Sequence, residues 1–344
     1  MLRTRHHSLT RARAAGATLA ASALVLAAAA CKDSGIKPGQ ATATPSAPAV
    51  VATETTTVPP AEATPKVPAN VSYAEAESVF RAKQYGQAAD MFAAYTTTHE
   101  KNPWGFYMLG LSAWKGGQLD RAQKAFEDAL ALDPKHVKSL VNLSRVLLEE
   151  GKPGDALERA TAAIAIDSGS SDAYRVLGRV QTALGRFDDA VDAYHTALTI
   201  DPEDVWSMNN MGLLFIQQGR FEEALGPLAR AVQLADSVPT FANNLGIALE
   251  RTGHYTAAAE AYRTALAADS TYEKVRASLA RVDGRRDEPG IDTVSVASLG
   301  DAFASEVAGW HDAHLAGQPA MLDSGAVAKV KMEPSSDSTH PPER

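Results

Sequence analysis

Glycine and small apolar residues recur with a period of 34 residues through the middle of the chain. Five glycines mark this period at the same offset, namely Gly117, Gly151, Gly185, Gly219 and Gly253. Glycine readily takes the left-handed backbone conformation that ends a helix, so each is expected to close a helix of about four turns. A second helix is expected to pack back against the first, so the pattern predicts a helix–turn–helix unit in every period.

Other positions keep the same register and separate large from small side chains. We expect small residues such as Gly178 and Ala190 to let the two helices of a unit approach closely, and Leu177 and Tyr194 to fill the space between units. The second helices are expected to end at residues such as Asp133 and Asp201, because a following proline disfavours helix at the preceding residue. The aligned columns are Leu109, Leu143, Leu177, Met211 and Leu245; Gly110, Ser144, Gly178, Gly212 and Gly246; and Phe126, Ala160, Tyr194, Leu228 and Tyr262.

These columns resemble the signature of the tetratricopeptide repeat, whose repeat length is 34. The resemblance covers residues 69–286 and implies an all-α fold, a right-handed superhelix (α-solenoid) of about six repeats. The repeats begin near residues 69, 103, 137, 171, 205 and 239, and a capping helix covers 273–284. In the first copy Lys83 replaces the turn glycine, and imperfect end copies are expected because terminal units face water on one side.

The N-terminus is predicted to be a signal peptide over residues 1–30. A segment rich in arginine precedes an uncharged run over 18–30, which is too short to span a bilayer. The run ends at Cys31 and resembles the lipobox of bacterial lipoproteins, although Ala28 stands where that motif usually has Leu. The resemblance implies a lipid anchor at Cys31 on a protein that faces the periplasm, and Lys32 favours the outer membrane. The alternative is an ordinary signal peptide with a chance cysteine.

Two further segments are expected to lie outside the array. The proline-rich stretch over 31–68 is predicted to be a disordered linker, because proline removes backbone donors and fixes φ. Residues 287–344 are predicted to be a mostly disordered tail with one short amphipathic helix over 297–315. That helix could fold back on the last repeat or occupy the groove of its own molecule. Its apolar face comprises Leu299, Phe303, Val307 and Trp310.

Composition narrows the function classes. The formal net charge of −8 disfavours nucleic acid as a partner. The single cysteine excludes an internal disulfide and thiolate metal sites. The sequence lacks a phosphate-binding Gly-rich loop after a strand and a His-Glu-x-x-His motif, so we expect no enzyme activity, cofactor, metal or small-molecule substrate.

The resemblance implies that partners bind in a concave groove lined by the first helix of each repeat. Aromatic side chains there would bury large areas, arginines would bind carboxylates, and asparagines would pair with a peptide backbone. Alternatively, the asparagines bridge helices, the tryptophans pack between repeats, and the arginines form a solvated face. The candidate binding residues are Tyr73, Trp104, Tyr107, Trp114, Asn142, Arg145, Arg175, Arg179, Trp206, Asn209, Asn210, Asn243 and Asn244.

Together these features predict a cell-envelope lipoprotein that serves as a protein–protein interaction scaffold. By resemblance, such proteins act in envelope assembly, including secretin and pilus assembly. The alternative is a permanent accessory subunit of a larger envelope complex. The sequence leaves the partner, the process and the oligomeric state open.

Overall fold

The computed structural model describes residues 70–290 and 293–317. The predicted signal peptide, Cys31, the linker up to residue 68 and residues beyond 317 therefore lie outside the described residues. Within the described ranges every regular element is an α-helix. The helices are α1 (Tyr73–Arg81), α2 (Tyr85–Thr98), α3 (Pro103–Lys115), α4 (Leu119–Leu132), α5 (Val137–Glu149), α6 (Pro153–Ile166), α7 (Ser171–Ala183), α8 (Phe187–Ile200), α9 (Val205–Gln217), α10 (Phe221–Leu234), α11 (Pro239–Arg251), α12 (Tyr255–Ala268), α13 (Glu273–Val282) and α14 (Val296–Leu315).

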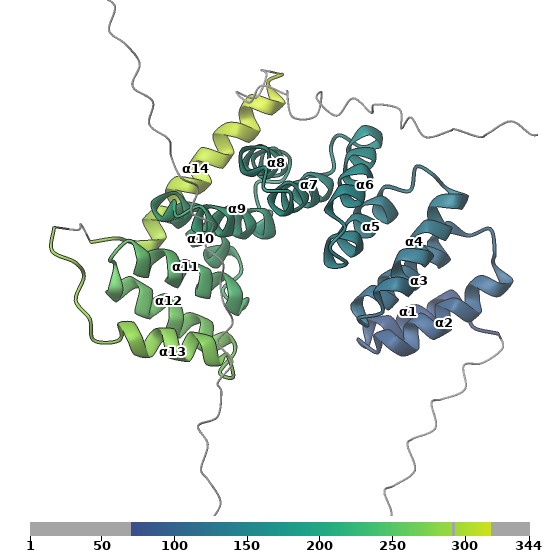
Figure 1. The fold of residues 1–344 in the computed structure, drawn as a ribbon, viewed down its shortest axis with the longest axis horizontal. Helices are drawn as coiled ribbons and strands as arrows, with labels where there is room; N and C mark the ends of the chain where they lie inside the picture. The colour runs from purple at the N-terminus through teal and green to yellow at the C-terminus, as the bar shows by residue number, and fades with distance from the viewer. Residues whose placement is uncertain (1–69, 291–292, 318–344) are drawn as a thin grey trace, which may run out of the picture. The chain divides into compact units, whose positions relative to one another are not determined.

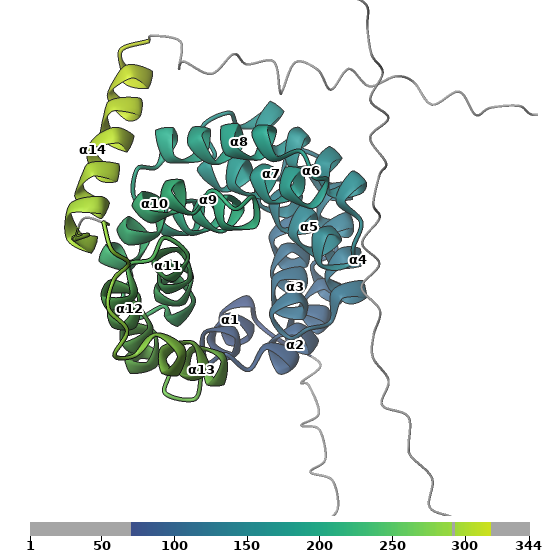
Figure 2. The same ribbon diagram turned by 60° about the vertical axis from the view of Figure 1, so that its left-hand side comes forward.

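The helices from α1 to α12 form six antiparallel pairs that stack in chain order, and α13 packs against α12 (Figure 1). From the second pair to the sixth, the first helices of neighbouring pairs also contact one another, in the order α3, α5, α7, α9 and α11. Figure 2 shows α3, α5, α9 and α11 on the inner side of this curved stack, with α4, α6, α8 and α12 outside. The all-α solenoid of six repeats and a capping helix is thus confirmed.

The turn inside each repeat depends on a left-handed residue. Gly117, Gly151, Gly185 and Gly219 have φ between 72° and 75°, and Gly253 has φ of 84°. In the first repeat, Lys83 takes the same conformation with φ of 61°. The left-handed region is unfavourable for residues that carry a Cβ, so the first turn is the strained one. The predicted role of the glycines is confirmed.

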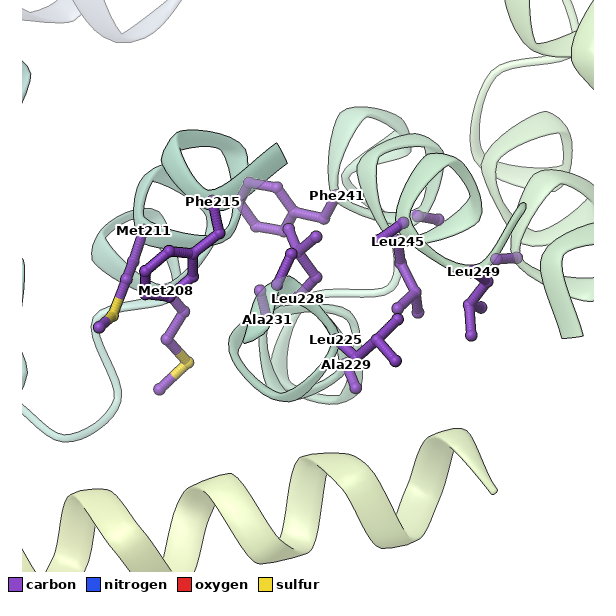
Figure 3. Close-up of a cluster of buried hydrophobic side chains, with 14 of the residues drawn as sticks. Met208, Met211, Phe215, Leu225, Leu228, Ala229, Ala231, Phe241, Leu245 and Leu249 are labelled. Atoms are coloured by element: carbon purple, nitrogen blue, oxygen red, sulfur yellow. The ribbon is translucent and has the colours of Figure 1, made fainter. Parts of the chain in front are cut away.

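Large and small side chains interlock within each pair. A Cβ added to Gly178 would lie 2.5 Å from the ring of Tyr194, and one added to Gly246 would lie 2.5 Å from the ring of Tyr262. Figure 3 shows how the core passes from one repeat to the next, with side chains of α9, α10 and α11 meeting around Leu228. The same aligned positions of the repeat therefore set how closely the two helices of a pair approach and which side chains are buried between neighbouring pairs.

Helix α14 lies on the outer layer of the array, against α10 and α8. Both positions expected for it, on the last repeat and in the groove, are therefore incorrect. Phe303 and Val307 are buried there, and Trp310 lies over the ring of His195 at 4.0 Å between centroids. Gly226 of α10 permits this contact, since a Cβ there would lie 3.3 Å from Phe303.

The segment before α14 is held to the sixth repeat by polar contacts. The hydroxyl of Tyr255 donates to Glu288 at 2.8 Å, and the backbone N–H of Thr256 donates to Asp287 at 2.8 Å. These contacts lead the chain back over the outer helices. Among the described helices, including the 20 residues of α14, none is long and apolar enough to cross a membrane.

Candidate functional site: the concave groove

A groove with a volume of about 1090 Å³ runs along the inner helices α3, α5, α7 and α9. Among the predicted binding residues, Tyr107, Trp114, Asn142, Arg145, Arg175, Arg179, Trp206 and Asn210 line it. Tyr73, Trp104, Asn209, Asn243 and Asn244 are not part of this lining. The structure therefore brings together the aromatic, basic and part of the amide groups predicted from four consecutive repeats.

The aromatic side chains divide into packed and exposed ones. Tyr73 makes edge contacts with Phe92 and Tyr95 at 5.4 and 5.7 Å, so it belongs to the packing between α1 and α2. Trp104 and Trp206 keep 45% and 51% of their surface exposed. Tryptophan is enriched among the hot spots of protein interfaces. Trp206 offers apolar area within the groove, whereas Trp104 lies outside the groove lining.

Trp104 is fixed by its neighbours although it is exposed. Its ring meets the imidazole of His136 edge to face with 4.5 Å between centroids, and the phenol ring of Tyr107 edge to face with 5.6 Å between centroids. The Nδ1 atom of His136 accepts from the backbone N–H of Ser139 at 3.2 Å, and burial lowers the pKa of this imidazole. The ammonium of Lys138 lies 5.4 Å from the Trp104 ring centroid. The side chain is thus positioned before any partner arrives, which reduces the entropy lost on binding.

Two of the three arginines are already paired within the chain. Arg175 donates two hydrogen bonds of 2.6 Å to Asp204, whose side chain is 2% exposed, and also contacts Asp172. Arg145 donates to Asp172 at 3.3 Å and to Oδ1 of Asn142 at 2.9 Å. Burial lowers the pKa of Arg145, with the carboxylate of Asp172 opposing that effect. The prediction of three equivalent carboxylate-binding arginines therefore needs correction, because Arg145 and Arg175 join successive repeats.

Arg179 differs from its two neighbours. It is half-buried on the groove wall and makes no ion pair with another described residue. Its guanidinium is consequently available to a partner's carboxylate.

The asparagines mostly satisfy one another. The amide of Asn244 donates to Asn209 at 2.9 Å, which joins α11 to α9. Asn209 donates to Asn210 at 3.5 Å, and Asn243 donates to Asn244 at 3.3 Å. Asn142 is buried and donates to the backbone carbonyl of Lys138 at 2.9 Å. The bridging alternative accounts for the contact between Asn244 and Asn209, whereas the other contacts lie within one helix. Asn142 and Asn210 also line the groove.

Asp172 and Leu213 are among the groove residues that the sequence analysis did not select. Asp172 occupies the same repeat position as Trp104 and Trp206, and Leu213 occupies the same position as Arg145 and Arg179. Repeat register alone was therefore sufficient to find both.

The groove offers a ligand charged groups, hydrogen-bonding groups and apolar surface. No group of three or more His, Cys, Asp or Glu that could hold a metal ion occurs in the described ranges. Most of the polar groups are held by hydrogen bonds or ion pairs, and the apolar lining ranges from the buried Val141 and Val176 to the exposed Trp206. Such a surface suits an extended polypeptide.

A family model described as tetratricopeptide repeat matches residues 107–171, 141–205 and 209–273. A comparison with curated proteins finds no match. Tetratricopeptide proteins generally act as scaffolds that bind proteins or peptides in their groove.

Solved structures that align with a TM-score above 0.5 agree on the fold. The Cut9–Hcn1 hetero-tetramer of the APC/C aligns with a TM-score of 0.54 and 16% identity, over 69% of this chain and 48% of that one. A tetratricopeptide repeat protein from Parabacteroides merdae aligns with a TM-score of 0.52 and 13% identity, over 61% of this chain and 82% of that one. A thermophilic tetratricopeptide protein from Thermus thermophilus is 23% identical, with a TM-score of 0.48, over 53% of this chain and 98% of that one. The family model thus places tetratricopeptide repeats within residues 107–205 and 209–273, and the helix pairs of the described residues stack into an α-solenoid.

Proposed function

We propose that this chain is a scaffold of the bacterial cell envelope that holds a segment of a partner protein in its concave groove. The observation that carries the proposal is the groove along α3, α5, α7 and α9, which combines the exposed Trp206 with Arg179, whose guanidinium makes no ion pair with another described residue. Hot spots of protein interfaces are enriched in these two residue types. The groove also repeats the same backbone unit along its length, which suits a ligand with a repeating backbone of its own.

The location in the envelope rests on the sequence before the array. The basic start, the short apolar run and Cys31 support export and acylation, and the proline-rich stretch up to residue 68 would serve as a tether. Secretin or pilus assembly is one process in which such a scaffold would act. Labelling with a palmitate analogue tests the anchor: wild type should incorporate the label and sediment with membranes. A Cys31→Ser variant that is still labelled would contradict it.

Site-specific photo-crosslinking tests the groove. Leu213 lies in the groove and Leu132 ends α4 on the outer layer, and both are leucines with about 40% of their surface exposed (36% and 41%). A photoreactive residue at 213 should capture a partner from envelope membranes, whereas the same residue at 132 should not. Capture from 132 alone would refute groove binding. If the partner captured at 132 also purifies in a fixed ratio with this chain, the permanent accessory subunit is the better description.

A further inference from the structure

The concave groove concentrates positive charge in a chain whose net charge is −8. Two carboxylates, Asp167 and Asp172, share the lining with a larger number of cations. Opposite charge across an interface steers partners and selects among them. The cationic side chains of the groove are Lys115, Lys138, Arg145, Arg175 and Arg179.

Three of these cations are not neutralised by an acid of the described residues. Arg145 and Arg175 share Asp172, and Arg175 also contacts Asp204, so this group is balanced. Lys115 lies 5.5 Å from the Trp114 ring centroid and Lys138 lies over Trp104, so their contacts are with aromatic faces. The positive charge that remains is therefore carried by Arg179 and by two lysines that flank aromatic rings.

Arg179 stands at the junction of two hollows. It lines the main groove and also a side pocket of about 210 Å³, whose other walls include Ala183, Leu213 and Leu214. Since one water occupies about 30 Å³ of liquid, this pocket has room for a side chain, and its walls of Ala183, Leu213 and Leu214 favour an aliphatic one. The Arg179 guanidinium and this apolar pocket thus lie close enough for neighbouring residues of one ligand to reach both.

We propose that the groove binds an extended acidic segment of a partner protein, with a carboxylate on Arg179 and a neighbouring aliphatic side chain in the side pocket. This proposal rests on the proposed function. Arginine binds carboxylates through two parallel hydrogen bonds, and such charge-assisted bonds are stronger than neutral ones. Three steps of roughly 9 Å between the helices from α3 to α9 give roughly 27 Å, which eight or so extended residues span.

Selection from a phage-displayed library of random twelve-residue peptides on the purified chain tests the proposal. Peptides selected on wild type should be enriched in Asp and Glu, and each should contain an aliphatic residue close to an acidic one. Arg179→Gln should weaken the selected peptides by about tenfold, as expected for loss of a charge-assisted bond. The matched control is Arg159→Gln, because Arg159 is an exposed arginine of α6 on the outer layer, and it should leave their affinity unchanged.

A second variant keeps the test decisive. Selection repeated on Arg179→Glu should favour basic peptides over acidic ones, and circular dichroism must show wild-type helix content. Selected peptides without an acidic bias, whose binding is lost in Trp206→Ala, would overturn the acidic partner but retain the groove as a binding surface. Failure to select any peptide, or binding that neither Trp206→Ala nor Arg179→Gln affects, would overturn the inference and the proposed function together.

Discussion

Replacing Gly178 by alanine adds a single methyl group where two helices touch. The new Cβ would lie 2.5 Å from the Cε1 atom of Tyr194, whose side chain is 2% exposed. Carbon atoms normally keep about 3.5 Å or more apart, so the ring or the helix must move by about 1 Å. Overpacking of this kind costs about 2–3 kcal/mol, while alanine in place of helical glycine returns about 1 kcal/mol. We expect a net loss of about 1–2 kcal/mol of unfolding free energy.

Urea-induced unfolding followed by circular dichroism measures this change. Gly154→Ala in α6 is the matched control, because no atom lies within 4 Å of its added Cβ, and it should be neutral or slightly stabilising. The third repeat already contains the opposite arrangement, with Ser144 facing Ala160. Gly178→Ser combined with Tyr194→Ala should therefore lose less than the two single changes added together. If Gly178→Ala is as stable as Gly154→Ala, the close approach of the two helices does not depend on the glycine.

Three other perturbations test separate contacts. Asp204→Ala leaves Arg175 half-buried without its main partner, and it removes the cap that accepts hydrogen bonds from the backbone at the start of α9. We therefore expect the free energy of unfolding, measured in urea, to fall by about 3 kcal/mol. An unchanged free energy of unfolding would refute the structural role of this pair. Phe303→Ala should release α14 locally, seen as faster proteolysis after α13 with the helix content of the array retained. Burial lowers the pKa of His195 to about 4 from an ordinary value of 6.5, so the unfolded or undocked chain binds the proton more tightly. Docking of α14 should thus be complete above pH 6.5 and weaken as the pH falls toward 4. The fluorescence of Trp310, which contacts His195, reports the docking, and His195→Gln should remove its pH dependence.

Local chemistry in the sequence determined the repeat, the helix boundaries and the turns. Gly185 and its equivalents predict a left-handed turn wherever they occur, and the pairing of Gly178 with Tyr194 follows from register within one unit. The segment containing Phe303 and Val307 was also expected to be helical, because its apolar spacing is itself local. Features that depend on neighbours within one or two turns can therefore be read without the structure.

Tertiary structure alone decided which groove residues are free. Arg145, Arg175 and Arg179 look alike in the sequence, yet Asp204 lies 29 residues from Arg175 and meets it only because successive repeats stack at one particular angle. The same stacking places Asn244 against Asn209 and so uses amides that were expected to bind a ligand. An amphipathic helix such as α14 buries its apolar side on any complementary surface, so its own pattern could not select the outer layer. That choice depended on Gly226, which leaves space for Phe303, and on the path that the preceding segment takes over the sixth repeat.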